Sequence, residues 1–160
     1  MRRLIIYADG AARGNPGPAG IGVVIEDERG RVLKEISRFV GQKTNNQAEY
    51  LALIQGLEAA AEYQADAILV RLDSELLVHQ LRGEYKVKSP LLKPLRNQAQ
   101  KLLARYKVVG IEHIERGYNR AADRLANQAI DAASADELTE GPNDNRQLSL
   151  WDQGKPLRRL

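Results

Sequence analysis

The feature that most constrains this chain is a short apolar run near its start, residues 4–8 (LIIYA), which ends on Asp9 and is followed at once by Gly10. Apolar, β-branched runs bounded by turn residues are typical of a strand that is buried on both faces. An ionised aspartate at the end of such a strand costs several kcal/mol unless it has a partner. The sequence therefore predicts either a basic side chain or a metal ion beside Asp9.

Composition limits the class of protein. A chain of 160 residues fits one domain, and 43% apolar with 28% charged residues is ordinary for a soluble protein. The absence of cysteine excludes disulfides and thiolate metal sites and suits a reducing cytoplasm, which is the expected location. Five apolar residues between Arg3 and Asp9 are too few for a signal peptide, and no apolar stretch reaches membrane-spanning length. The net charge of +3 permits a nucleic-acid partner without requiring one.

Hydrophobic patterns and turn residues predict an alternation of strands and helices. Dense glycine and proline make residues 10–20 an expected loop. Three strands followed by alternating helices and strands predict a mixed sheet with helices on its faces. After the first strand, the expected strands are residues 21–26, 32–40, 67–72 and 108–114, and the expected helices are residues 45–63, 75–83, 89–103 and 120–133.

Helix starts carry specific signals. Thr44 with Gln47 three residues later is a capping-box pattern, and Ser74 and Asn119 are expected to cap the helices that follow them. Pro90 is expected in the first turn of its helix, where proline is tolerated.

Acidic residues recur where these elements begin or end. Asp9 and Asp73 each close an apolar strand, and parallel neighbouring strands, about 4.8 Å apart, bring such ends together. Glu49 lies one turn into its helix and Asp123 in the first turn of another. Four crowded carboxylates raise one another's pKa, which divalent cations relieve in a way that suits phosphoryl chemistry. Acids at helix starts and on exposed helix faces are also common without a ligand. Four acids by themselves therefore leave two interpretations open, a metal site and ordinary structural or solvent-exposed roles.

Four blocks of sequence resemble the ribonuclease H type 1 family, in its order and at its spacings: residues 9–17 (DGAARGNPG), 44–49 (TNNQAE), 72–74 (LDS) and 119–126 (NRAADRLA), within residues 1–133. The resemblance implies the α/β ribonuclease H fold, a five-stranded mixed sheet with helices on both faces. It also implies endonucleolytic cleavage of the RNA strand of RNA–DNA hybrids, giving 5′-phosphate and 3′-hydroxyl ends, with Mg²⁺ or Mn²⁺ as cofactor, two ions with substrate bound. The metal ligands that the resemblance implies are Asp9, Glu49, Asp73 and Asp123.

Choosing a hybrid requires sensing the ribose 2′-hydroxyl, for which amides and backbone groups are suited. By the resemblance, Asn15, Asn45 and Asn46 match positions that contact the nucleic acid, Gly10 matches a backbone contact, and Thr44 matches a contact to a phosphate of the DNA strand. Each asparagine or threonine also has a local use, because Asn15 suits a turn and Thr44 suits a helix start.

The chain departs from the family at three places. Glu75 stands where many relatives have an amide, and its charge repels phosphate. The loop of residues 115–119 is short and lacks the histidine of well-known bacterial relatives, so Arg116 is the candidate for positive charge near the site. His79 and His113 are expected to be structural or exposed.

The third departure is the missing basic substrate-binding protrusion, which predicts weaker and strongly salt-sensitive binding. The lysines that remain as candidate phosphate contacts are Lys86, Lys88 and Lys93.

Residues 134–160 are expected to be a flexible C-terminal tail beyond the ribonuclease H domain of residues 1–133. The tail contains a stretch, residues 147–151 (QLSLW), that looks like the peptide by which bacterial repair proteins bind the sliding clamp, with tryptophan in place of phenylalanine. Two leucines and an aromatic ring on a tether suit peptide capture, although the tail could instead pack on the domain or on a second copy. The expected clamp-binding residues are Gln147, Leu148, Leu150 and Trp151.

Other functions remain open at this point. The same fold acts on double-stranded RNA or on DNA junctions in other members of the wider superfamily, and a hybrid-binding module tethered to the clamp would not cleave at all. A missing carboxylate would indicate binding without cleavage, and all four carboxylates are present. The sequence therefore favours catalysis.

Overall fold

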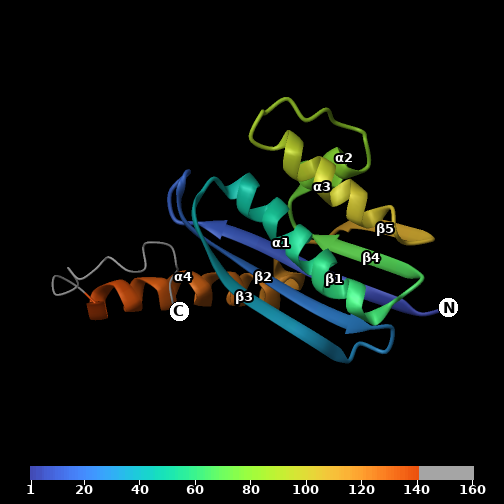
Figure 1. Cartoon of the computed structure of the whole chain (residues 1–160), viewed down its shortest axis with the longest axis horizontal. Helices are drawn as coiled ribbons and strands as arrows, with labels where there is room; N and C mark the ends of the chain where they lie inside the picture. Colours follow the sequence, from blue (N-terminus) through green and yellow to red (C-terminus); the bar gives the residue numbers. More distant parts are fainter. Residues whose placement is uncertain (141–160) are drawn as a thin grey trace. The chain divides into compact units, whose positions relative to one another are not determined.

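The computed structural model describes residues 1–140, and within them it shows a five-stranded mixed sheet with the strand order β3-β2-β1-β4-β5 (Figure 1). No helix among the described residues is long and apolar enough to cross a membrane. The strands are β1 (Arg3–Ala12), β2 (Gly17–Asp27), β3 (Val32–Lys43), β4 (Ala67–Leu72) and β5 (Val108–His113). The helices are α1 (Asn45–Ala60), α2 (Glu75–Leu81), α3 (Lys93–Leu103) and α4 (Arg120–Glu140), with the 3-10 turns η1 (Ala61–Tyr63) and η2 (Arg116–Tyr118).

β1 occupies the centre of the sheet. It pairs antiparallel with β2 along its length and parallel with β4 only as far as the pair Ala8 and Leu72. Asp9 therefore does not end the strand as predicted, because β1 runs on to Ala12 against β2 alone. The parallel pairing stops just before Asp9 and Asp73, so these two acids lie side by side at the same edge.

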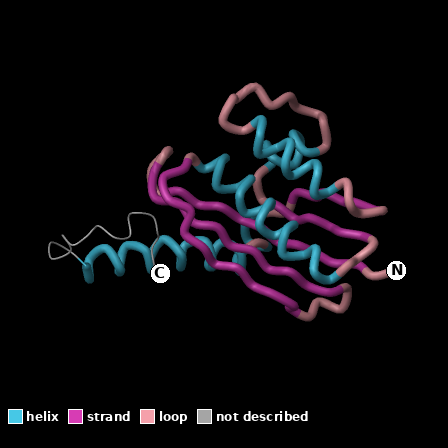
Figure 2. Tube along the Cα trace, in the orientation of Figure 1, coloured by secondary structure: helices cyan, strands magenta, loops and turns pink. Residues whose placement is uncertain are grey.

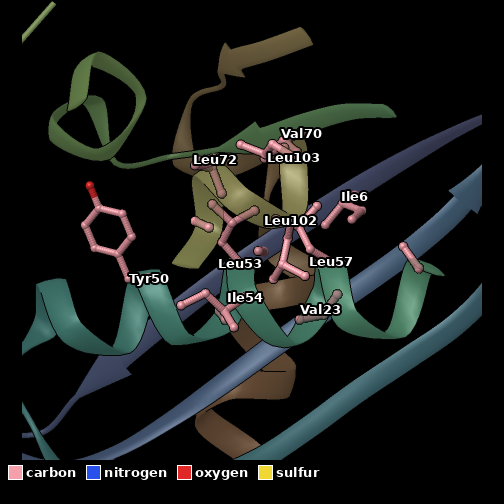
Figure 3. Packing of buried hydrophobic residues seen from close by; sticks show 14 of the residues in the cluster. Ile6, Val23, Tyr50, Leu53, Ile54, Leu57, Val70, Leu72, Leu102 and Leu103 are labelled. Atoms are coloured by element: carbon pink, nitrogen blue, oxygen red, sulfur yellow. The ribbon is translucent and has the colours of Figure 1, made fainter. Parts of the chain in front are cut away.

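α1 covers one face of the sheet and supplies much of the core (Figure 2). It approaches closely at Gly56, where a Cβ atom would lie 3.0 Å from Val23 Cγ1 and 3.3 Å from Ile6 Cγ2. Figure 3 shows this packing between α1, the sheet and α3. The core residues labelled there are Ile6, Val23, Tyr50, Leu53, Ile54, Leu57, Val70, Leu72, Leu102 and Leu103.

The start of α4 packs on the opposite face of the sheet, over β2 and β3. A Cβ atom at Gly22 would lie 1.9 Å from the carbonyl oxygen of Ala122, and Ser37 Oγ donates to the carbonyl oxygen of Leu125 at 2.6 Å. Helices therefore cover both faces, as predicted. This contact needs a glycine in β2, because any side chain at position 22 would occupy the space of the helix backbone.

β1 is less buried than its apolar sequence predicted. Ile6 and Ala8 are buried, but Ile5 and Tyr7 on the other face are half-buried. Tyr7 lies beside Arg71, whose Nη1 donates to the Tyr7 hydroxyl at 2.7 Å and whose Nε donates to Glu112 at 2.6 Å. The polar side chains of Arg71 and Glu112 thus lie beside Tyr7 on this face, in place of apolar packing.

Several expected boundaries were wrong. The predicted loop of residues 10–20 shrinks to residues 13–16, since Gly10 and Gly20 lie in strands at points where a helix backbone approaches closely. α3 begins at Lys93 with Pro94 in its first turn, and Pro90 lies in a turn whose amides bond back to the carbonyl of Ser89. α4 continues to Glu140, seven residues beyond the expected end at Ala133. The capping box at Thr44 and the cap at Ser74 are confirmed.

Candidate active site

Three carboxylates from three elements converge at the edge of the sheet. Asp9 comes from β1, Glu49 from the second turn of α1, and Asp73 from the residue after β4. One oxygen of each lies within 4.8 Å of the others. The meeting of Asp9 and Asp73 follows from the pairing of β1 with β4, and α1 adds Glu49 from above that edge.

Gly10 brings α1 against β1 at this point. A Cβ atom there would lie 2.2 Å from the carbonyl carbon of Ala48 and 2.4 Å from the amide nitrogen of Glu49. The Gly10 N–H donates to Glu49 Oε1 at 3.1 Å. Gly10 therefore positions Glu49 directly, which the sequence did not reveal, while its expected contact with nucleic acid stays a prediction.

The three acids perturb one another. Burial, followed by the charges of Glu49 and Asp73, raises the pKa of Asp9 to about 10. Burial and the charge of Asp73 raise the pKa of Glu49 to about 8, although the Gly10 N–H and the Arg116 charge offset part of that rise. All three acids cannot be ionised together near neutral pH without a compensating positive charge.

This donor set fits a divalent cation. Carboxylate oxygens are the ligands that Mg²⁺ and Mn²⁺ prefer, and the crowding of three acids is what such an ion relieves. Of the two partners that the sequence left open for Asp9, no basic side chain is found in a salt bridge with it among the described residues. A cation site is therefore the better explanation of the buried carboxylate.

Asp123 lies next to this group and not within it. It stands in the first turn of α4, and its proximity contributes to the raised pKa of Asp9, after burial and the charges of Glu49 and Asp73. Asp123 is not among the three acids whose oxygens are mutually within 4.8 Å. Its predicted role as a fourth ligand is compatible with this place at the edge of the cluster and stays a prediction.

Asn119 joins the site in a way that the sequence did not show. Its side chain is buried, and Nδ2 donates to the carbonyl oxygen of Ala8 at 3.0 Å and to Asp73 Oδ2 at 2.9 Å. The predicted side-chain cap is wrong, because Asn119 Oδ1 has no hydrogen-bond partner in the described part of the chain. Its partners are 111 and 46 residues away in sequence, so no local pattern could have identified them.

Most of the predicted substrate-contact residues lie around the N-terminus of α1. Asn45 Oδ1 accepts a hydrogen bond from the Ala12 N–H at 3.1 Å, and Asn15 Oδ1 accepts one from the Asn45 N–H at 2.9 Å. Thr44 is the helix cap, and Asn46 is half-buried in the first turn. These contacts give Asn15, Asn45 and Thr44 structural roles, and their contacts with nucleic acid stay predictions.

The remaining predicted residues are at the surface. Arg116 is exposed in η2, and its charge reaches Glu49. Glu75 is exposed at the start of α2.

The two histidines are structural or exposed, as expected. His79 bonds to Glu84 at 2.5 Å and stacks on Tyr85, and His113 is exposed in β5. Lys86, Lys88 and Lys93 are exposed, and the clamp-like residues 147–151 lie outside the described residues.

Comparison with known proteins identifies the family. A family model described as reverse transcriptase-like matches residues 7–129. Three mycobacterial proteins, among them a bifunctional protein of Mycobacterium tuberculosis, are 45% identical over 133 residues, which is 82% of this chain and 36% of each relative. The chain thus spans about a third of the length of these curated relatives.

Two solved structures resemble the whole sheet and its helices. The crystal structure of RNase H1 from the archaeon Halobacterium salinarum shares 45% sequence identity, has a TM-score of 0.79, and matches over 81% of this chain and 98% of that one. LC11-RNase H1, crystallised in complex with an RNA/DNA hybrid, shares 48% identity with a TM-score of 0.77, over 81% of this chain and 98% of that one. By sequence, fold and the arrangement of its acidic residues, this chain belongs to the ribonuclease H type 1 family.

Proposed function

We propose that this chain is a metal-dependent endoribonuclease that hydrolyses the RNA strand of RNA–DNA hybrids. The observation that carries the proposal is the convergence of Asp9, Glu49 and Asp73, with oxygens within 4.8 Å of one another and raised pKa values for Asp9 and Glu49. Support for the substrate comes from LC11-RNase H1, which was crystallised with a hybrid. The products are 5′-phosphate and 3′-hydroxyl ends.

Asp9, Glu49 and Asp73, with Asp123 at their edge, would hold Mg²⁺ or Mn²⁺, two ions when substrate is bound. Ions held there would lower the pKa of an attacking water and offset the negative charge that develops on the scissile phosphate. The protein's own contribution is the fixed placement of the carboxylates. Gly10 orients Glu49, and Asn119 orients Asp73.

The residues around the start of α1 would choose the substrate. Asn15, Asn45 and Asn46 present amides and backbone groups that can read a 2′-hydroxyl, and Thr44 stands at a helix N-terminus, where phosphate is favoured. Exposed Arg116, whose charge already acts on Glu49, would add positive charge close to the scissile phosphate. Exposed Glu75 opposes phosphate binding on the α2 side.

The test is cleavage of one sequence presented as a hybrid, as duplex RNA, as duplex DNA and as a DNA junction, with Mg²⁺ and with Mn²⁺. We expect cleavage of the RNA strand in the hybrid, and loss of at least about 1000-fold in rate for Asp9→Asn with an unchanged fold. Glu58→Gln, an exposed acid on α1, serves as the control. Faster cleavage of duplex RNA or of a DNA junction than of the hybrid would show that the proposed substrate is wrong. Tight binding of the hybrid without cleavage would show that the chain is a hybrid-binding module and not a nuclease.

We also propose, from the sequence of residues 147–151, that the C-terminal segment binds a bacterial sliding clamp. Leu150 and Trp151 would fill apolar pockets on the clamp. Binding of the full chain to purified clamp, lost in a Leu150→Ala/Trp151→Ala double variant that still cleaves hybrid, is the expected result. Failure of the unaltered chain to bind would refute this part alone.

A further inference from the structure

A series of hydrogen bonds joins the loop after β1 to Asp123 in α4. Arg13 Nη2 donates to Asn127 Oδ1 at 3.1 Å and to the Asn127 carbonyl oxygen at 3.5 Å. Asn127 Nδ2 in turn donates to Asp123 Oδ1 at 3.3 Å and to the Asp123 carbonyl oxygen at 3.1 Å. The side chain of Asn127 thus stands between a cation and one of the four acids of the site.

The chemistry of the three groups fixes the direction of these bonds. A guanidinium can only donate, so Arg13 requires the amide oxygen of Asn127 to face it. The amide NH₂ of Asn127 then faces Asp123, whose Oδ1 and carbonyl oxygen accept its hydrogen bonds. Arg13 therefore selects the one orientation of the Asn127 amide that supports the carboxylate.

Asp123 needs such support more than the other three acids. Asp9 is buried, Glu49 accepts the Gly10 N–H, and Asp73 accepts from Asn119. Asp123 is half-buried on a helix, outside the three acids that lie mutually within 4.8 Å. A neighbour one helical turn away is well placed to restrict its side-chain rotamers.

We propose that Asn127 is a positioning residue, oriented by Arg13, which holds the Asp123 carboxylate ready to bind a divalent cation. This inference rests on the proposed function. The loop that carries Arg13 also carries Asn15, which bonds to the first residue of α1. The same short loop therefore contacts both the start of α1, where substrate is expected to bind, and the residue that holds Asp123.

The experiment compares Asn127→Ala and Asn127→Gln with Gln128→Ala, an exposed neighbour on α4. A purely structural role, in which Asn127 only joins Arg13 to α4, predicts that Asn127→Ala changes stability and leaves the Mn²⁺ affinity of the folded protein unchanged. We expect instead a dissociation constant for Mn²⁺, measured by calorimetry on the full chain without substrate, that rises about 10-fold. Asn127→Gln keeps the amide donor and should recover part of that affinity.

Kinetics on the hybrid should show the same pattern. In Asn127→Ala the Mg²⁺ concentration for half-maximal rate should rise by about the same factor and kcat should fall, while KM for the hybrid at saturating Mg²⁺ stays within about twofold. The effects of Arg13→Ala and Asn127→Ala on Mn²⁺ affinity should be non-additive in the double variant, because Arg13 acts through Asn127. Arg105→Ala, which removes an exposed charge elsewhere, is the control for Arg13→Ala.

Each outcome is decisive. If Asn127→Ala matches Gln128→Ala in Mn²⁺ affinity, or changes only KM for the hybrid, the positioning role is wrong. Additive effects in the double variant would remove Arg13 from it. An unaltered chain that binds Mn²⁺ but does not cleave hybrid would refute the proposed function, while the Mn²⁺ affinities of the variants would still decide the role of Asn127.

Discussion

At the scale of single residues, the site is a group of crowded acids whose ionisation is unfavourable in the folded protein. Asp9 is only 5% exposed and is surrounded by Glu49, Asp73 and Asp123. Two neutral residues, Gly10 and Asn119, help to position these acids. Gly10 provides an N–H and the space for α1, and Asn119 ties Asp73 to the backbone of β1. Neutral neighbours therefore help to fix the side chains of Glu49 and Asp73.

The raised pKa values predict how the stability of the metal-free protein depends on pH. Burial raises the pKa of Asp9 to about 10 and that of Glu49 to about 8, so the native state keeps protons that the unfolded chain has released. The native state then binds more protons than the unfolded state, and the free energy of unfolding falls as pH rises between the unfolded and native pKa values. Stability should fall from about pH 5 upward, and less steeply above about pH 8, by at most about 1.4 kcal/mol per pH unit for each of the two groups.

Urea denaturation in the presence of a chelator measures this dependence. Asp9→Asn should flatten the curve and be more stable than the unaltered chain at the alkaline end, because it removes the buried ionisable group. Glu58→Gln, at an exposed position of α1, should leave the slope unchanged. A slope that is the same in Asp9→Asn would show that Asp9 is not the group responsible.

At the scale of elements, two close approaches bring the site together. Gly10 lets the start of α1 meet β1, and Gly22 lets α4 lie directly on β2. The residue after Ala122, which contacts Gly22, is Asp123. The distance between sheet and α4 thus sets the position of one of the four acids.

Gly22→Ala tests this dependence. Its Cβ atom would lie 1.9 Å from the Ala122 carbonyl oxygen, so α4 must move. We expect a loss of about 1–3 kcal/mol in the free energy of unfolding, and a lower kcat even where the protein is folded. Gly117→Ala is the control, because nothing lies within 4 Å of its added Cβ. Activity and stability that match those of the control would mean that α4 is not held by this contact.

At the scale of the whole molecule, exposed lysine and arginine side chains are the groups that a polyanionic substrate would contact. Exposed Lys86 and Lys88 lie in the segment between α2 and α3, where the sequence predicts that the family's basic protrusion is missing. Binding of a hybrid should therefore be weak at moderate salt concentration, and Lys86 and Lys88 should account for part of its salt dependence.

The salt dependence of hybrid binding, measured by fluorescence anisotropy without divalent ions, checks this expectation. The plot of log affinity against log salt concentration should lose about two units of slope in the Lys86→Ala/Lys88→Ala double variant. Lys101→Ala, in the last turn of α3, should change it little. An unchanged slope in the double variant would place the phosphate contacts elsewhere.

Local chemistry made much of the fold predictable. The run of residues 67–72 was identified as a strand with its true bounds, and the caps at Thr44 and Ser74 were correct, because each signal lies within a few neighbouring residues. The boundaries that failed depend on partners elsewhere. Pro90 and Pro94 both suit a first helical turn, and only packing selects Pro94. Gly20 was assigned to a loop, because its neighbour Ala126 in α4 is brought close to it only by the tertiary structure.

The family, the strand that carries Asp9 and the acids that can share a cation could be predicted from the kinds of residue and their spacing. The structure was needed to show that β1 continues past Asp9, that the Asn119 side chain bonds to Asp73, and that Asn127 stands between Arg13 and Asp123. The physical reason is that a hydrogen bond depends on distance and direction in space. Strand register and helix packing set both of these, and they join residues as far apart as 114 positions in the chain.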